Sequence, residues 1–399
     1  MGNNLELGEQ DFKEDKYDRL RRITWWEQER LTSATIMVAG AGAIGNEIIK
    51  NLALLGVGRI LIADMDAIEN SNLTRSVLFR AKDVGRYKAE VAAERASEIN
   101  PDVQTKALNL NVIDDIGLGV FRRVNMVLGG LDNREARLAI NQSCYRVGKP
   151  WIDGAIEVLN GFARVFMPSD GACYECTMTE TDWKLVNKRK SCALLTQEQL
   201  NEGKIPTTPT SSAIIAGIQV QEMLKILHND RELPTLAGKC YVFNGVTHDS
   251  YVVEYQRKPD CINHEILGSI EERPWSVHTL TLREMVDSIK KEMGKEAVVD
   301  FDRDFISTAT CICGESKDIF APIHKLKASN IKCPKCGHSM SFENFHSLDG
   351  SETFLERTAG ELGIPPLHII SGRVGMTLKH FEFSADENEI FSEFTVGGI

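Results

Sequence analysis

Apolar and polar positions along the first part of the chain predict strands and helices in alternation. Residues 34–39 form a short apolar run that ends at a cluster of glycines, as a buried parallel strand does. Apolar residues then recur at helical spacing over 43–56. The same patterns predict strands at 59–64 and 126–130 and a helix at 86–98. This order of elements predicts an α/β fold with a doubly wound, Rossmann-like sheet.

The segments around this unit have other patterns. Residues 1–33 are charged and are predicted to be helical, with Trp25 and Trp26 as packing anchors. Residues 151–176 and 239–256 look strand-like. Between them, the polar segment 180–210 is predicted to be an exposed crossing loop, followed by an apolar helix at 211–228.

The composition of the chain changes near residues 265–272. A predicted helix at 280–293 is followed by four cysteines and then by a mixed α/β tail. We therefore predict three parts: an N-terminal helical segment, 1–33; an α/β domain, 34–268, that includes the crossing loop; and a smaller C-terminal α/β domain, 272–399, that contains zinc.

Composition and charge narrow the class of protein. Of the 399 residues, 42% are hydrophobic and 26% are charged, as in a globular protein. The net charge of −11 disfavours nucleic acid as a partner, because non-specific binding needs clustered lysine and arginine. No apolar run approaches the ~20 residues that span a bilayer. The polar N-terminus has no apolar signal core. We expect a cytoplasmic protein that does not bind membranes.

A glycine-rich loop follows the first predicted strand and opens the first helix. Gly40, Gly42 and Gly45 allow phosphate to approach the backbone closely, and the helix N-terminus supplies free N–H groups. Asp64 ends the second predicted strand, where a carboxylate binds a ribose hydroxyl. These residues alone fit an NAD enzyme as well as an enzyme that uses ATP.

Motifs farther along the chain distinguish the two. Asp64-Met-Asp66 is followed by Glu69-Asn-Ser-Asn72-Leu-Thr-Arg75, then by Val84-Gly-Arg-Tyr-Lys88 and by Leu131-Asp132-Asn133. This ordered set resembles the adenylation domain that ubiquitin-activating enzymes share with bacterial activators of sulfur-carrier proteins. The resemblance covers roughly residues 15–265.

The resemblance implies ATP and Mg²⁺ as cofactors and assigns a role to each motif. Arg75 and Lys88 match the clamps on the triphosphate, Asn72 a polar nucleotide contact, Asp132 the Mg²⁺ ligand, and Asp64, with Asp66 beside it, the ribose contact. Arg19 matches an arginine that reaches the ATP of a partner subunit, so a homodimer is expected. Lys16 and Thr74 depart from the family, in which Arg and Gln are usual.

Eight cysteine and histidine residues are spaced as zinc ligands. Cys173 and Cys176 form a CxxC pair, and Cys261 and His264 form a CxxH pair where relatives usually have CxxC; together they predict a Cys₃His zinc site. A second predicted zinc site, of the ribbon type, consists of Cys311, Cys313, Cys333 and Cys336. An alternative is that one of these later pairs completes the site at Cys173 and Cys176.

Cys192 is the candidate nucleophile. It lies in the crossing loop, where ubiquitin-activating relatives carry their thioester-forming cysteine, and Lys188, Arg189 and Lys190 precede it. Neighbouring cations favour the thiolate, which attacks an acyl-adenylate. An incidental exposed cysteine is the alternative. Cys144 and Cys240 lie in apolar segments and are expected to be inert.

The predicted function is activation of a ubiquitin-like protein with a C-terminal glycine. ATP would adenylate that glycine, Cys192 would form the thioester, and a conjugating enzyme would receive the protein. One alternative is an adenylyltransferase for a sulfur-carrier protein of the molybdopterin, thiamine or tRNA-thiolation type. Two others are an NAD-dependent oxidoreductase and a catalytically silent scaffold. The C-terminal domain is a candidate for partner recruitment.

Overall fold

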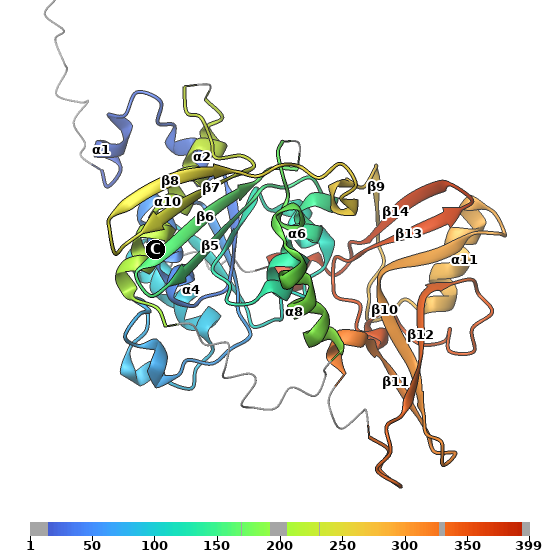
Figure 1. Ribbon diagram of the computed structural model, residues 1–399. Helices are drawn as coiled ribbons and strands as arrows, with labels where there is room; N and C mark the ends of the chain where they lie inside the picture. Colours follow the sequence, from blue (N-terminus) through green and yellow to red (C-terminus); the bar gives the residue numbers. More distant parts are fainter. Residues whose placement is uncertain (1–14, 169, 192–205, 231, 327–331, 393–399) are drawn as a thin grey trace, which may run out of the picture.

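The fold contains two β-sheets that lie side by side (Figure 1). The computed structural model describes residues 15–168, 170–191, 206–230, 232–326 and 332–392. The first sheet has eight strands and the second has six. Within the described residues, no helix is long and apolar enough to cross a membrane.

The first sheet is doubly wound and mostly parallel, with the strand order β3-β2-β1-β4-β5-β6-β7-β8. Strands β1 to β5 are parallel to one another, and β6 to β8 continue the sheet in antiparallel fashion. The α/β fold class predicted from the sequence is confirmed. The strands are β1 (Thr35–Ala39), β2 (Arg59–Ala63), β3 (Gln104–Leu108), β4 (Met126–Gly129), β5 (Trp151–Glu157), β6 (Asn160–Phe166), β7 (Lys239–Asn244) and β8 (Asp249–Glu254).

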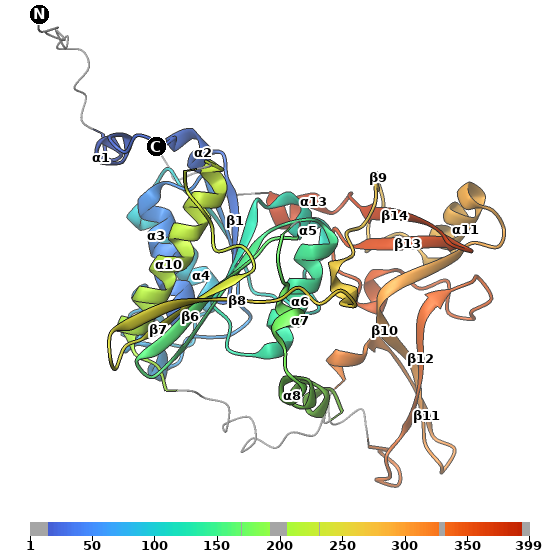
Figure 2. The same ribbon diagram turned by 45° about the horizontal axis from the view of Figure 1, so that its top comes forward.

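Helices cover both faces of this sheet (Figure 2). Because successive side chains of a strand point to opposite faces, β1 places Ile36 and Val38 in one core and Met37 and Ala39 in the other. The helices α3 (Ala43–Leu55), α4 (Lys88–Ile99) and α10 (Pro209–His228) pack in the first core. The helices α5 (Leu118–Arg123), α6 (Arg134–Arg146) and α7 (Tyr174–Thr177) contribute to the second.

The N-terminal segment differs from the prediction of one charged helix. The described part has two short helices, α1 (Asp18–Arg21) and α2 (Gln28–Thr32), because the chain between them turns to bury aromatic side chains. The rings of Trp25 and Trp26 lie 5.0 and 5.4 Å from the ring of His228 in α10, so both tryptophans are packing anchors as predicted.

The predicted crossing loop also begins differently. Its first residues form the helix α8 (Glu180–Ser191), and residues 192–205 lie outside the described residues. Asp182 stabilises the first turn by accepting a hydrogen bond from the backbone N–H of Thr179, at 2.9 Å. Its other oxygen accepts from Nε of Arg134 in α6, at 2.8 Å, which fixes α8 against the first sheet's helices.

The second sheet has the strand order β11-β10-β13-β14-β9. Strand β12 is outside this order and also pairs with β10. Its strands are β9 (Ile270–Arg273), β10 (Val298–Thr310), β11 (Ser316–Pro322), β12 (Ser341–Leu348), β13 (Ile369–Val374) and β14 (Thr377–Phe383). The helix α11 (Leu282–Met293) covers it, and α13 (Glu387–Phe391) returns to β3. Strands β10, β11 and β12 extend away from the rest of the molecule as an arm (Figure 1).

Buried ion pairs join the two sheets. Glu382 on β14 is fully buried and accepts hydrogen bonds from both Arg122 and Arg123 of α5. Asp302 on β10 lies 3.2 Å from Nη1 of Arg146, at the end of α6. The second sheet is therefore fixed against the helices that cover the first.

Candidate functional site

The glycine loop joins the end of β1 to the start of α3 and leaves no room for side chains at two positions. Gly40 has a φ of +90°, a backbone conformation that favours glycine. A Cβ atom added at Gly45 would lie 1.9 Å from the carbonyl oxygen of Gly40. A Cβ at Gly42 would meet only the oxygen of Gly130, at 4.0 Å. Gly42 is the N-cap of α3, so the free N–H groups of that helix begin at this loop.

Asp64 fastens the end of β2 to the glycine loop. Its Oδ2 accepts a hydrogen bond from the N–H of Ala41 at 2.7 Å, and its Oδ1 accepts from the N–H of Asp66 at 2.9 Å. Burial raises the pKa of Asp64, and the nearby charge of Lys88 opposes that shift. The carboxylate therefore lies beside the loop, where the sequence predicted a ribose contact.

Lys88 contacts the segment that follows Asp64. Its Nζ is 2.7 Å from Oδ2 of Asp66, and its side chain is only 13% exposed. Asn72 and Arg75 lie in the connection between β2 and α4. There the side chain of Asn72 accepts from the N–H of Glu69, and Nη1 of Arg75 donates to the carbonyl of Ser71 at 3.0 Å.

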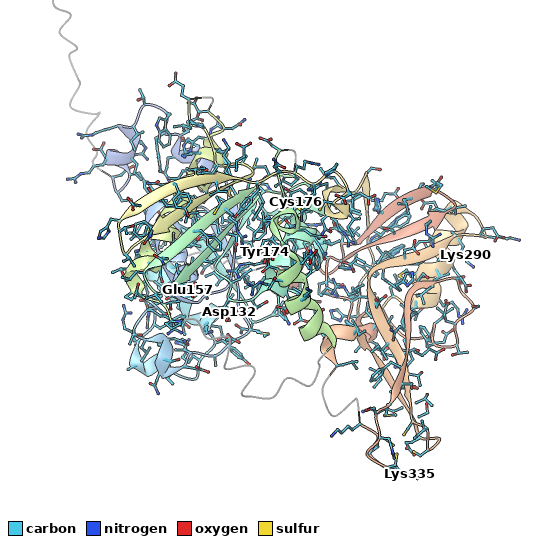
Figure 3. All side chains as sticks on the ribbon, in the orientation of Figure 1. Asp132, Glu157, Tyr174, Cys176, Lys290 and Lys335 are labelled. Atoms are coloured by element: carbon cyan, nitrogen blue, oxygen red, sulfur yellow. The ribbon has the colours of Figure 1, made fainter. Side chains whose placement is uncertain are left out.

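Asp132 follows β4, the strand next to β1 (Figure 3). The N–H of Gly130 donates to the carbonyl of Ala39, so the chain before Asp132 runs beside the glycine loop. The side chain of Asp132 is exposed and accepts a hydrogen bond from Nδ2 of Asn133 at 3.2 Å. An exposed carboxylate at this position has the chemistry that Mg²⁺ prefers.

Arg19, unlike the other predicted ATP-site residues, lies away from the glycine loop. It is exposed on α1, close to Tyr17, whose hydroxyl lies 2.1 Å from an ideal Cβ at Gly56. Gly56 ends α3, whereas the glycine loop begins it, so roughly 20 Å of helix separates the two ends. Within one chain Arg19 is therefore remote from the glycine loop.

Sequence reasoning missed a buried asparagine that shapes the loop. Nδ2 of Asn46 donates to the carbonyls of Ala41 and Gly42, at 2.6 and 3.0 Å. Its Oδ1 accepts from the N–H of Leu78, at 2.9 Å. The sequence alone does not reveal this role, because only the fold shows that Asn46 is fully buried, where apolar residues are usual.

A buried charge cluster beneath Asp132 was also missed. Arg137 donates through Nε to Oδ1 of Asp153 at 2.8 Å and through Nη2 to the carbonyl of Leu131 at 2.6 Å. Arg164 contacts the other oxygen of Asp153 and stacks on the ring of Tyr174, 4.9 Å from its centroid. The cluster connects the chain before Asp132 to the segment that carries Cys173 and Cys176.

The four ligand atoms of the first predicted zinc site lie within 4.8 Å of one another. Sγ of Cys173 is 3.7 Å from Sγ of Cys176 and 3.6 Å from Sγ of Cys261, and Sγ of Cys176 is 3.2 Å from Nε2 of His264. Tetrahedral zinc with bonds of ~2.3 Å places its thiolates ~3.8 Å apart. These residues can therefore hold a zinc ion.

The second cysteine quartet is separate from the first. The Cys311–Cys336 and Cys313–Cys333 sulfur pairs lie 3.4 and 3.6 Å apart, again suited to a metal ion. Figure 3 shows Lys335, beside this quartet, at the far end of the arm, while Cys176 lies near α6. The structure thus brings Cys261 and His264, rather than the later cysteines, to Cys173 and Cys176.

Three of the ten cysteines belong to neither quartet. Cys192 lies outside the described residues. Cys144 and Cys240 are buried, and burial raises the pKa of both thiols. A thiol with a raised pKa is a poor nucleophile at neutral pH, so the structure agrees with the expectation that these two are inert.

Comparison with known protein families gives a match over residues 14–263 to the ThiF family. This match covers more than half of the 399 residues. The chain belongs to the ThiF family. The ThiF match thus includes the glycine loop, Asp132 and the three cysteines of the first quartet and ends one residue before His264, while the second quartet lies well beyond the matched residues.

Relatives of this ThiF protein include activators of two kinds. Ubiquitin-like modifier-activating enzyme 5 of Dictyostelium discoideum is 30% identical over 254 residues, which cover 59% of this chain and 62% of that protein. A sulfur carrier protein adenylyltransferase of Thermus thermophilus is 30% identical over 255 residues, or 62% of this chain and 89% of that protein. The chain spans less than two thirds of the length of the Dictyostelium, rice and Arabidopsis relatives.

Solved structures support the fold of the ThiF domain. A crystal structure of E. coli MccB with ATP has a TM-score of 0.53 and 23% sequence identity, and the match covers 64% of this chain and 75% of that one. Membership of the ubiquitin-activating-like family, predicted from the sequence, is confirmed.

Proposed function

We propose that this protein uses ATP to adenylate the C-terminal glycine of a ubiquitin-like or sulfur-carrier protein. The observation that carries the proposal is the arrangement of Asp64, Lys88 and Asp132 around a glycine loop that opens a helix. The names of the relatives support it, since they include activators of both kinds of protein. Membership of the ThiF family favours adenylation over an NAD-dependent oxidoreductase or a silent scaffold.

The reaction would join a carboxylate to AMP. One oxygen of the substrate's terminal carboxylate attacks the α-phosphorus of ATP, the bond to the bridging oxygen breaks, and pyrophosphate leaves. Lys88 and Arg75 would hold the phosphates, and Asp64 the ribose. Mg²⁺ held by Asp132 would neutralise charge on the phosphate oxygens.

Arg19 would act in a second copy of the chain. Arg19 lies on α1, beside the end of α3 that is far from the glycine loop. Its guanidinium therefore cannot reach the glycine loop of its own chain. A homodimer that brings α1 of one protomer to the loop of its partner would complete the phosphate contacts.

ATP–pyrophosphate exchange that depends on a Gly-ending carrier protein tests adenylation. Asp132→Asn should reduce the exchange rate by about a thousandfold, since charge neutralisation at the phosphates would be lost. Asp170→Asn is the matched control, because Asp170 is exposed and follows β6, which runs antiparallel to β5 and so ends at the sheet edge opposite to the glycine loop. Normal exchange in Asp132→Asn would overturn the assignment.

A thioester on Cys192 is the second step of the proposal, and it would distinguish conjugation from sulfur transfer. The thiolate would attack the carbonyl carbon of the acyl-adenylate and release AMP. Cys192→Ala should retain exchange but lose a band, on a non-reducing gel, that disappears with added thiol. If exchange is intact and the unmodified protein forms no such band, the sulfur-carrier alternative is favoured.

A further inference from the structure

A groove at the base of the arm is lined mainly by acidic and aromatic side chains. It encloses about 690 Å³ between β10, β11, β12 and the segment 351–361. The segment follows β12 and lies outside the matched ThiF residues. We propose that this groove binds a basic segment of a protein partner, one that carries lysine or arginine beside an apolar side chain.

The charge of the groove is strongly one-sided. Among the described residues that line it, five carry carboxylates and one, Arg357, is cationic, which leaves a formal charge of −4. This is more than a third of the chain's net charge of −11, concentrated in one groove. The carboxylates belong to Asp318, Glu343, Glu352, Glu356 and Glu361.

These carboxylates differ in how available they are to a ligand. The side chains of Asp318 and Glu356 are 70% and 74% exposed, although Asp318 pairs with Arg357 and Glu356 pairs with Arg283. Glu343 is exposed, and its carboxylate has no hydrogen-bond or ion-pair partner among the residues that the structure describes. Glu352 instead accepts the N–H groups of Asp349 and Gly350 and so orders the turn beside the groove.

Arg357 shows how the groove can hold a cation. Its guanidinium lies 3.9 Å from the ring centroid of Phe320, and its Nη2 is 3.5 Å from Oδ2 of Asp318. A planar cation between an aromatic face and a carboxylate gains from both contacts. Phe320 in turn lies 5.1 Å from the ring of Phe354, so apolar surface adjoins the charged rim.

The backbone is bent where the groove forms. Phe320 has a φ of +48°, a conformation that a phenylalanine rarely adopts. The pairing of β10 with β11 shifts register between Ile306 and Thr308, opposite this residue. Such bulges reorient side chains and cluster near functional sites, and strain of this kind is retained where it serves one. Here the bulge accompanies the contact between Phe320 and Phe354.

A basic protein segment fits this surface better than other ligands do. Phosphate groups of nucleic acids or anionic lipids would be repelled by the carboxylates. A cationic side chain would instead gain charge complementarity, and its apolar neighbour would cover the phenylalanines. The binding is independent of the adenylation proposal; its use to recruit a protein substrate or acceptor rests on that proposed function.

Fluorescence anisotropy without ATP tests the groove directly. The probe is a labelled peptide of about ten residues in which lysine and leucine alternate, titrated with the full chain. Glu343→Lys should weaken binding about fivefold, because it removes one attraction and adds one repulsion. Glu296→Lys, which changes the charge equally on an exposed loop before β10, should bind as the unmodified protein does.

Three outcomes would overturn the inference. The basic peptide could fail to bind, a matched peptide of glutamate and leucine could bind equally well, or both variants could weaken binding equally. An unchanged thermal unfolding midpoint in Glu343→Lys would verify that the variant folds. Because the titration contains no ATP, its result is distinguishable from a failure of pyrophosphate exchange.

Discussion

Nε of Arg137 lies 2.8 Å from Oδ1 of the fully buried Asp153, and Nη2 of the same guanidinium holds the carbonyl of Leu131. This pair therefore links α6 and β5 to the residue directly before Asp132. Arg164 contacts the second oxygen of Asp153 from β6. One carboxylate thus neutralises two guanidinium groups that have little access to water.

Removal of that carboxylate charge should be costly. Asp153→Asn would leave two arginines without their counter-charge, so we expect the free energy of unfolding to fall by about 3 kcal/mol. Urea unfolding measures this. Glu157→Gln is the matched control, because Glu157 lies on the same strand but is exposed, and it should change stability by less than ~0.5 kcal/mol. Equal stability of the two variants would contradict this role.

The glycine loop offers a pair of substitutions that separates folding from nucleotide binding. In Gly45→Ala the new Cβ would lie 1.9 Å from the oxygen of Gly40, so we expect a loss of ~1–3 kcal/mol in stability. In Gly42→Ala the nearest atom would be 4.0 Å away, so the protein should fold normally. The methyl group would still stand where phosphate should approach the helix.

Thermal unfolding and ATP titration check this pair of variants. Gly42→Ala should keep its unfolding midpoint but bind ATP about tenfold more weakly. Gly45→Ala should lose both stability and binding. Unchanged ATP binding in Gly42→Ala would mean that phosphate does not contact this loop.

Much of the first sheet could be predicted because its buried strands are short apolar runs next to glycine. The prediction failed for β3, whose residues Gln104 to Leu108 include polar side chains, since it is an edge strand with one half-covered face. The strands of the arm were missed for a similar reason: β12 is largely exposed and lacks an apolar run.

The site was predictable only where a local motif carried it. The glycines, Asp64 and the cysteine pairs stand at characteristic spacings, so the sequence reveals them. Arg137, Asp153 and Arg164 come from different elements and acquire their roles only when the sheet brings them together. An isolated arginine in a sequence looks like a solvated charge.

The two cysteine quartets should hold about two zinc ions per chain, one in each. Cys176→Ser and Cys333→Ser should each lower the zinc content by about one, as measured by atomic absorption. Cys240→Ser is the control, since Cys240 belongs to neither quartet. His264→Cys should retain zinc whereas His264→Ala should lose it, because a thiolate can replace the imidazole.

Loss of the second zinc should affect the arm alone. Among the described residues, the hydrophobic cluster around this quartet has only Ala309 and Met340 as buried members besides two cysteines, with Ile319 and Phe342 packed against it. So small a core cannot hold the arm without a metal. Cys333→Ser should thus become sensitive to protease within the arm while pyrophosphate exchange continues. A protease-resistant arm in zinc-free protein would contradict this.

The ion pairs between the two sheets predict a dependence of stability on pH. Oδ1 of Asp302 lies 2.9 Å from Nε of Arg303, and its Oδ2 lies 3.2 Å from Nη1 of Arg146. Although burial opposes ionisation, His368 and Arg303 hold the pKa of Asp302 well below its ordinary value of 3.8. Because the folded-state pKa is the lower one, this carboxylate stabilises the protein above pH 3.8, and the contribution is lost as pH falls through the folded-state pKa.

Asp302→Asn should therefore be less stable than the unmodified protein by about 2 kcal/mol at neutral pH. Urea unfolding at a series of pH values should show this difference shrinking as the pH falls below 3.8, because the carboxylate of the unfolded state takes up a proton there while the native carboxylate is still ionised. Asp304→Asn, on the same strand with its side chain 57% exposed, should show little difference at any pH. A constant difference down to the acid limit would mean that packing, rather than the charge of Asp302, joins the two sheets at this point.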